Sequence, residues 1–333
     1  MTAIILGQRQ PFRGLRRLDP RRDLRQVAGL IAATFGADLD AEGRAALRDL
    51  RFLSRLGPLI GFVLAADPQW QRFLNGYVWI EEERVVGNLT LQSGGRYGGR
   101  WYIYNLAVAP AYRGRGIASA LVKAALEEVQ RQGGGWVTLQ VEEDNEAARH
   151  LYERLGFEPL GGISHLTLPQ PPEVPPQIGD VDLRCRRADD WYQEYELAKA
   201  ATPAPLQWWQ PLRSEAFRLY PEERLGEWLD RLIGRRRTYR WVVEEDPQGR
   251  LMASLMVRAT RWRGEHQLRL IVHPDARGTL EEPLIRHALA VLNSYPSHPT
   301  VTRHPAEHRQ AIEAFLAHGF HLRRTLVAMR KKM

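Results

Sequence analysis

The 333-residue chain holds a single cysteine, Cys185, so it can form no internal disulfide and no zinc site built from several thiolates. The longest uncharged apolar run, residues 56–66, is far shorter than the ~20 residues that span a bilayer. The first residues, MTAIILGQRQ, lack the basic segment and apolar stretch of a signal peptide. We therefore expect a cytoplasmic protein with no membrane partner.

Lysine is also scarce, because only four of the 47 basic residues are lysines and the other 43 are arginines. A net charge of +8 is compatible with a nucleic-acid partner. The arginines, however, are spread along the chain among 39 acidic residues, and the densest cluster, residues 9–25, has no aromatic residues alternating with it for base stacking. An RNA or ribosome binder would be expected to cluster its arginines, so we predict no nucleic-acid partner.

Five prolines lie in LPQPPEVPPQIGD, residues 168–180, a composition typical of a stiff, extended linker. This segment divides the chain into a first domain, residues 1–167, and a second domain, residues 181–333. Both lengths are ordinary for a globular domain with its own core.

Apolar periodicity and glycine or proline boundaries predict a mixed α/β fold in the first domain. A helix of about 15 residues connects two strands, which predicts that strands 101–108 and 136–141 run parallel. The predicted strands are 12–18, 76–80, 85–92, 101–108 and 136–141, and the predicted helices are 24–35, 41–56, 58–64, 117–131 and 146–155.

The second half repeats the first more weakly. At a shift of 163 residues, Asn145, Tyr152 and Gly156 fall on His308, Phe315 and Gly319. Upstream, VAPAYRG falls on VHPDARG at a shift of 164. A nearly constant offset over two separate blocks indicates an internal duplication.

The stretch APAYRGRGIASALV, residues 109–122, ends a strand and begins a helix through Gly114 and Gly116. Two glycines in this turn leave backbone N–H groups uncovered at the helix N-terminus. Free donors and the positive end of the helix dipole both favour an anion there.

Residues 101–157 resemble the GCN5-related N-acetyltransferase (GNAT) superfamily. The resemblance rests on LAVAPAYRGRGIA, which carries the R-x-x-G-x-G/A pattern as Arg113, Gly116 and Ala118, and on NEAARHLYERLGF, residues 145–157. It implies two tandem domains, each with a mixed, mostly antiparallel sheet, a splayed parallel strand pair and flanking helices. It also implies acetyl-CoA as cosubstrate and no metal.

The resemblance assigns the CoA contacts. The strand end would pair with pantetheine, the loop would donate to the pyrophosphate, the two arginines would attract it, and the small Ala118 would permit close approach. The residues are Leu106, Ala107, Val108, Arg113, Gly114, Arg115, Gly116, Ile117, Ala118 and Asn145.

Tyr152 is the candidate general acid. Its phenol, with an unperturbed pKa of about 10, is protonated at neutral pH and can donate to a departing thiolate. Asn145 lies seven residues earlier, about 700° of helical rotation, so both side chains are predicted on one face. The resemblance implies the catalytic role of Tyr152; packing beside Leu151 and Leu155 is the alternative.

No general base can be assigned. In the branch of the superfamily that acetylates ribosomal-protein N-termini, a glutamate stands where this chain has Gln140, which cannot take a proton. Glu142, Glu143 and Asp144 fit a solvated strand end, and Tyr102 and Tyr104 could position water. The acceptor is therefore predicted to be a small-molecule amine rather than a peptide N-terminus.

The second copy lacks the features needed for CoA. RGRGIAS becomes RGTLEEP, which places Glu281 and Glu282 at the helix start, where carboxylates favour the dipole and repel a phosphate. Phe315 replaces the candidate acid. We expect a degenerate domain that neither binds CoA in the superfamily's manner nor catalyses.

Two other motifs in this half admit more than one interpretation. HPAEH, residues 304–308, matches a zinc pattern, but Pro305 suits the first helical position, so His304 should precede the helix and no metal site is expected. PAPLQWWQP, residues 203–211, is predicted as a loop. Trp208 and Trp209 in it could line an acceptor pocket, contact the other domain or pack in a core.

The sequence thus predicts an acetyl-CoA-dependent N-acetyltransferase whose first domain is active. The alternative is a non-catalytic acyl-CoA sensor or scaffold, which the intact Tyr152 disfavours.

Overall fold

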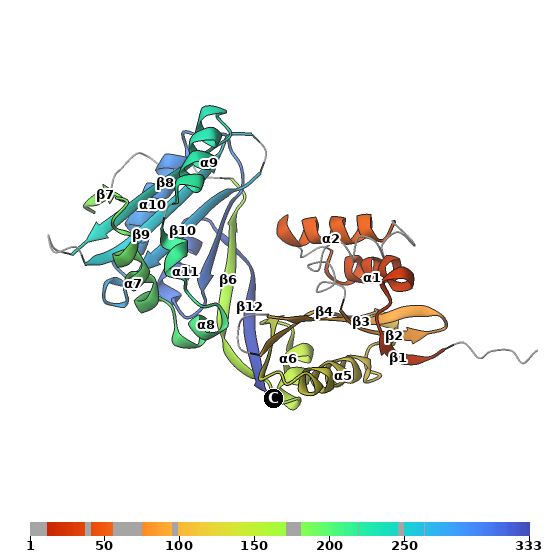
Figure 1. Cartoon of the computed structure of the whole chain (residues 1–333). Helices are drawn as coiled ribbons and strands as arrows, with labels where there is room; N and C mark the ends of the chain where they lie inside the picture. Colours follow the sequence, from red (N-terminus) through yellow and green to blue (C-terminus); the bar gives the residue numbers. More distant parts are fainter. Residues whose placement is uncertain are drawn as a thin grey trace, which may run out of the picture. The chain divides into compact units, whose positions relative to one another are not determined.

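The computed structural model describes residues 12–36, 41–55, 75–94, 99–170, 181–218, 220–245, 250–262 and 264–333. Their contacts form two compact units. The first comprises residues 1–140, 151–158 and 330–333, and the second comprises residues 141–150 and 159–329. Each unit is a sheet with helices on both faces (Figure 1).

In the first unit, β1 to β5 follow one another in space in the order of the sequence. The neighbours from β1 to β4 are antiparallel, and β4 and β5 are parallel, as predicted. The strands are β1 (Gly14–Arg17), β2 (Gly76–Glu81), β3 (Arg84–Ser93), β4 (Arg100–Val108) and β5 (Trp136–Glu142). The helices α1 (Pro20–Phe35) and α2 (Ala41–Leu53) cover one face, and α5 (Ile117–Arg131) and α6 (Glu146–Arg154) lie toward the other (Figure 1).

The start of α1 is fixed by its first residues. Asp19 accepts a hydrogen bond from the backbone N–H of Arg21 at 3.0 Å, and Pro20 occupies the first turn, where its missing N–H costs nothing. Apolar residues at helical spacing, among them Val27, Leu30 and Ile31, then pack on Val78, Ile80 and Val85 of the sheet. This cluster anchors the helix that covers β3 and β4.

The second unit has the spatial order β12-β6-β11-β10-β9-β8-β7. Within this unit β10 and β11 are parallel, whereas β9 with β10, β6 with β11, β7 with β8 and β8 with β9 are antiparallel, so each unit has a mixed, mostly antiparallel sheet, as predicted. The strands are β6 (Glu158–Leu168), β7 (Leu183–Cys185), β8 (Arg236–Glu244), β9 (Leu251–Thr260), β10 (His266–Val272), β11 (Thr300–Pro305) and β12 (His321–Lys332).

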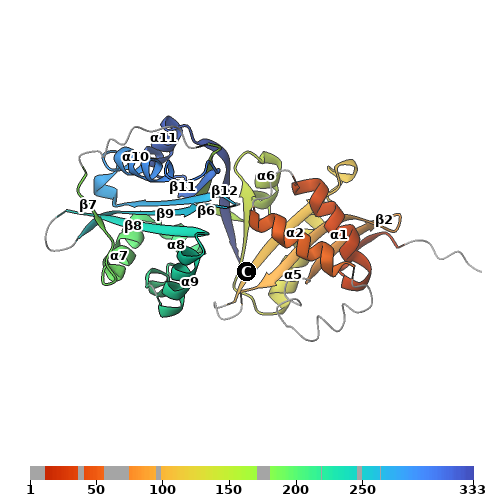
Figure 2. The ribbon, with the colours of Figure 1, turned by 90° about the horizontal axis from the view of Figure 1, so that it is seen from above.

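Five α-helices described in the second unit occupy its two sheet faces (Figure 2). One face carries α7 (Trp191–Ala201), α8 (Ala204–Trp209) and α9 (Pro221–Leu232), and the other carries α10 (Glu281–Leu292) and α11 (Arg309–Ala317). The main core lies beneath α10 and α11, where Leu284, Leu289 and Phe315 are fully buried.

The internal repeat is confirmed. The helix α6 begins at Glu146 and α11 at Arg309, 163 residues apart. The short 3-10 helices η2 (Pro110–Tyr112) and η4 (Pro274–Ala276) are 164 residues apart, and so are the starts of α5 and α10.

The compact units are discontinuous in sequence, whereas the sequence predicts a boundary at residues 168–180. The strand β6 falls almost wholly in the second unit, and the last four residues fall in the first, where the Met333 N–H donates to the Gly135 carbonyl at 3.0 Å. The division into domains 1–167 and 181–333 stays a prediction about the two repeats.

The structure corrects one sequence prediction, and two others lie outside the described residues. Residues 203–211 are not a loop throughout, because α8 forms directly after Pro203 and the Gln210 N–H donates to the Leu206 carbonyl at 2.8 Å. The predicted helix 58–64 and residues 171–180 of the predicted linker lie outside the described residues. None of the described helices is both long and apolar enough to cross a membrane.

Candidate active site

The parallel pair of the first unit separates after three residue pairs. Arg100, Trp101 and Tyr102 pair with residues 136–138, whereas β4 continues to Val108 without further pairing to β5. The edge of β4 facing β5 is therefore not paired with that strand at Leu106, Ala107 and Val108, although the Val108 carbonyl accepts a hydrogen bond from a side chain of the following loop. Such an edge can accept an extended ligand as an added strand.

A bulge in β4 accompanies this separation. The register between β3 and β4 shifts between Asn88 and Thr90, and Asn105 has a positive φ of 52°. The fully buried Asn88 donates from Nδ2 to the Asn105 carbonyl at 3.0 Å, which fixes the bulge. Sequence reasoning missed Asn88, although a polar residue in an apolar strand was a readable signal.

The loop after η2 is open at the N-terminus of α5. Gly114 and Gly116 have φ of 74° and 78°, and a Cβ at either would meet nothing within 4 Å. Among the described residues, the amides of residues 114–116 donate no hydrogen bond. The side chain of Ile117 is buried, so only its backbone can face a ligand, and Ala118 is half-buried.

Both loop arginines are exposed and have local contacts. The Arg113 Nε donates to the Val108 carbonyl at 3.2 Å, which ties the loop to the strand end. Arg115 donates from Nη2 to the Ala111 carbonyl at 3.1 Å and lies 5.0 Å from the Tyr112 ring centroid. Their guanidinium groups remain at the surface beside the open amides, where they can attract an anion.

Tyr152 lies in α6 with 5% of its surface exposed, in edge contact with Phe157. Burial raises the pKa of its phenol well above the ordinary value, so the group stays protonated. Its hydroxyl has no hydrogen-bond partner among the described residues. This is the arrangement that a proton donor needs.

Asn145 is an exposed residue just before α6, and its Oδ1 accepts from the Ala148 N–H at 3.1 Å. The side chain therefore caps the helix, a role that sequence reasoning missed, while its amide nitrogen remains a donor. Contacts assign Asn145 to the second unit and Tyr152 to the first. A shared role of the two at CoA stays a prediction.

The candidate bases are few. Tyr102 and Tyr104 stack at 6.0 Å on β4, and burial, with a smaller contribution from Tyr102, raises the pKa of the Tyr104 phenol. The Glu81 carboxylate is engaged by Trp79 Nε1 at 3.0 Å and by Arg13 at 2.6 Å. Hydrogen bonding from Trp79 lowers the pKa of Glu81, which makes it a weaker base.

In the second copy the equivalent loop is closed by Glu281. The Gly278 N–H, equivalent to that of Gly114, donates to Glu281 Oε2 at 2.8 Å. The other carboxylate oxygen lies 2.7 Å from Nε2 of His308. Burial raises the pKa of Glu281, but the hydrogen bonds from His308 and backbone amides outweigh it and hold the pKa below its ordinary value.

His304 completes a buried row of three polar groups. Its Nε2 lies 2.8 Å from Nδ1 of His308, and both imidazoles are nearly fully buried. His304 belongs to β11, as predicted, and His308 directly precedes α11. The described residues contain no group of three or more His, Cys, Asp or Glu side chains suited to a metal.

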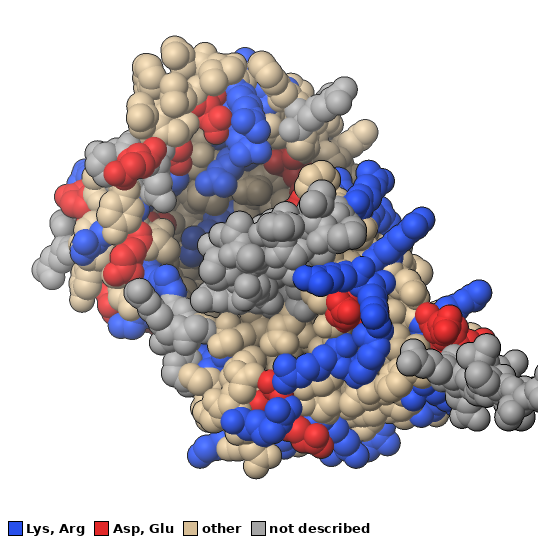
Figure 3. All heavy atoms as spheres, turned by 45° about the vertical axis from the view of Figure 1, so that its right-hand side comes forward, with Lys and Arg blue, Asp and Glu red and all other residues tan. Residues whose placement is uncertain are grey.

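Arginine is interleaved with acidic residues on the face seen in Figure 3. Ion pairs take up many of these charges, for example Glu128 with Arg17 and Arg131 in the first unit. The absence of a nucleic-acid partner stays a prediction.

Comparison with known proteins identifies relatives of the first half. The sequence profile of the acetyltransferase (GNAT) family matches residues 45–157. N-alpha-acetyltransferase 30 of Schizosaccharomyces pombe is 38% identical over 91 residues, which are 27% of this chain and 59% of that protein. Mycothiol acetyltransferase of Renibacterium salmoninarum is 31% identical over 146 residues, 43% of this chain and 40% of that protein. The chain thus spans less than two thirds of these relatives.

Two solved structures share the fold over nearly the whole chain. A GCN5-related N-acetyltransferase from Sphaerobacter thermophilus has a TM-score of 0.60 at 19% identity, covering 96% of this chain and 95% of that one. A tandem GNAT protein from the clavulanic acid biosynthesis pathway has a TM-score of 0.51 at 19% identity, covering 96% and 98%. These likenesses support the tandem fold.

The buried His304 should make stability depend on pH. Burial, with the charges of His308 and Arg277, lowers its pKa to about 3, below the 6.5 of an unfolded chain. As pH falls below 6.5, His304 takes up a proton in the unfolded state but stays neutral in the native state, so the free energy of unfolding decreases. Between pH 7 and pH 4.5 this decrease should exceed that of His304→Gln by about 2–3 kcal/mol.

Denaturant titrations at the two pH values measure this difference. The exposed His321→Gln serves as control and should follow the wild type. Equal pH sensitivity of His304→Gln and the wild type would contradict the prediction.

Proposed function

The chain belongs to the acetyltransferase (GNAT) superfamily, and from this premise we propose that it transfers an acetyl group from acetyl-CoA to a primary amine of a small molecule. The open loop at the N-terminus of α5 carries the proposal. It offers three backbone amides that have no partner in the part of the chain that the structure describes, two exposed arginines and two glycines with no side chain above them. These features fit a pyrophosphate.

Different residues of the first repeat bind the cosubstrate and donate the proton. The amides of residues 114–118 hold the pyrophosphate, and the unpaired edge at residues 106–108 aligns the pantetheine arm, with Asn145 as a further donor. When CoA is bound, its thioester supplies the activated acetyl group. The protonated Tyr152 donates its proton to the sulfur as the carbon–sulfur bond breaks. The amine nitrogen attacks the acetyl carbon and loses its own proton to solvent or to an unassigned base.

The small-molecule acceptor is supported by Gln140, which supplies no base for peptide acetylation, and by the second repeat with its aromatic segment. The name of one relative favours the other possibility, because N-alpha-acetyltransferases act on protein N-termini. A non-catalytic acyl-CoA sensor is the third possibility. The protonated hydroxyl of Tyr152 disfavours it, because a sensor needs no proton donor.

The first test concerns binding. Isothermal titration should give one acetyl-CoA per chain, because the loop of the second copy is closed by Glu281. Gly116→Glu should abolish binding, since a carboxylate in the open loop opposes the phosphate charge. Gly133→Glu is the matched control, another glycine with positive φ and open space, at the far end of α5. Two equivalent sites, or equal loss in both variants, would contradict the proposal.

The second test concerns the proton donor. Tyr152→Phe keeps the ring that packs on Phe157 and removes the hydroxyl. We expect kcat to fall by a factor of about 10²–10⁴ while the Kd for acetyl-CoA changes little. Tyr112→Phe, a change beside the loop, should retain kcat. Wild-type kcat in Tyr152→Phe would make Tyr152 a packing residue.

The third test identifies the acceptor class. Release of free CoA thiol is followed with a library of small amines and a library of peptides with free N-termini. Turnover with small amines and none with peptides is expected. A preference for peptides would indicate that the acceptor is a peptide N-terminus rather than a small amine. No turnover with either library would favour the non-catalytic acyl-CoA sensor. Deletion of residues after 172 is unsuitable, because residues 330–333 belong to the first unit.

A further inference from the structure

A polar cavity of about 480 Å³ lies within the second unit, on the face of the sheet that carries α7 and α9. Alternate residues of three strands form its floor: Arg236, Thr238 and Arg240 of β8, Ser254, Met256 and Arg258 of β9, and Arg269 of β10. The register places Met256 opposite both Arg240 and Arg269, so the two arginines flank it. All lining residues belong to the second unit.

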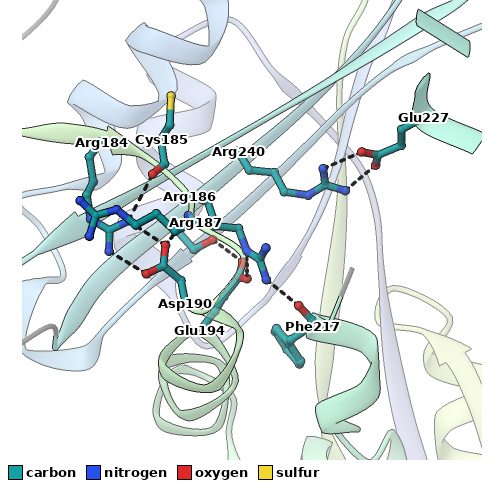
Figure 4. Close-up of polar contacts among 10 residues, drawn as sticks. Arg184, Cys185, Arg186, Arg187, Asp190, Glu194, Phe217, Glu227 and Arg240 are labelled. Carbon is teal, nitrogen blue, oxygen red and sulfur yellow. Dashed lines mark hydrogen bonds and ion pairs between the residues drawn. The ribbon is translucent and has the colours of Figure 1, made fainter. Parts of the chain in front are cut away.

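Two of the five lining arginines are neutralised by carboxylates. Arg186 pairs with Glu194 at 2.7 Å and also donates to the Phe217 carbonyl (Figure 4). Glu194 also accepts a hydrogen bond from the Ser254 hydroxyl. Arg240 forms a two-pronged pair with Glu227 of α9, at 2.6 and 3.1 Å (Figure 4). These pairs brace the cavity walls and leave little charge of their own.

The other three arginines have no carboxylate partner among the described residues. Arg258 donates only to the Gln267 amide oxygen, at 3.2 Å, and Arg269 lies 5.4 Å from the Phe217 ring centroid. Arg269 is an exposed residue, and partial desolvation by the surrounding protein lowers the pKa of its guanidinium, against the attraction of Glu194. The third is Arg236, at the start of β8.

One acidic group faces these three cations, because Asp230 of α9 lines the cavity without an ion pair among the described residues. Three positive charges and one negative charge leave an excess of two. Guanidinium groups match the planar oxygens of carboxylates and phosphates. A dianion would therefore neutralise the cavity.

We propose that this cavity of the second domain binds a small dianion, either a dicarboxylate or a phosphate monoester, through Arg236, Arg258 and Arg269. The site goes beyond acetyl transfer, since it contains none of the predicted CoA contacts. The second domain would then bind a ligand in this cavity, although the loop before α10 is closed by Glu281.

Isothermal titration of the full chain tests the proposal, at low ionic strength and pH 7.5. Succinate probes the dicarboxylate, glycerol 3-phosphate the phosphate monoester, and acetate is the monoanion of reference. At least one dianion should bind once per chain and at least tenfold more tightly than acetate. Binding should weaken as salt rises. Comparison of the two dianions identifies the class.

Variants locate the site. Arg269→Gln and Arg236→Gln should each weaken binding about tenfold or more, because each removes a charge-assisted contact. Arg237→Gln is the matched control: it makes the same change of charge one residue along β8, on the opposite face, and should change the Kd less than twofold. Arg269→Lys should retain part of the affinity and reports on the site if Arg269→Gln fails to fold.

Three outcomes would overturn the proposal. They are no dianion binding at millimolar concentration, equal affinity for acetate, and equal weakening by Arg237→Gln and Arg236→Gln. Gly116→Glu separates this site from the CoA site, since it should abolish acetyl-CoA binding and leave the dianion affinity unchanged. Dianion binding lost in Gly116→Glu would place the ligand in the loop of the first repeat.

Discussion

A parallel strand pair that separates after three residue pairs is the constraint on which both repeats depend. It occurs between β4 and β5 and again between β10 and β11. Separation leaves backbone groups that must find other partners. In the first repeat the Arg113 side chain serves one of them, the Val108 carbonyl, and no residue of β4 after Tyr102 is paired with β5. The fold thus supplies a place for an extended ligand before any catalytic residue is considered.

The two repeats treat their helix N-termini in opposite ways. In the first, glycines with positive φ keep the amides uncovered, and arginines stand beside them. In the second, the Glu281 carboxylate accepts a hydrogen bond from the equivalent amide, that of Gly278, and its other oxygen lies within hydrogen-bond distance of His308. A carboxylate supplied by the chain satisfies the same donors as a phosphate supplied by a ligand. The closure therefore satisfies from within the chain a donor that stays uncovered in the first repeat.

Local signals predicted the elements around the loop closely. Glycines at 114, 116 and 133–135 and the apolar period between them gave α5 its observed bounds, and Gly156 marked the end of α6. The Asp19–Pro20 start of α1 was readable but was placed too late, at Leu24. The sequence could not predict that β6 belongs to the second unit and residues 330–333 to the first. Strands that pair over such long sequence separations leave no local pattern in the sequence. The Asn145 cap is local and was readable from the sequence, whereas Asn88 could be singled out as a polar residue in an apolar strand but its partner on β4 could not be predicted.

The two repeats also differ in where their unpaired positive charges lie. In the first, the exposed Arg113 and Arg115 lie beside open amides, so dipole and cations act together on one ligand. In the second, the loop carries Glu281, and unpaired arginines instead occupy the sheet face beneath α7 and α9. Arg269 is an exposed residue with no carboxylate partner among the described residues, so its charge is available to a ligand. Because such unpaired guanidinium groups add to the positive potential of the cavity, the second repeat can attract an anion at its sheet face rather than at its helix N-terminus.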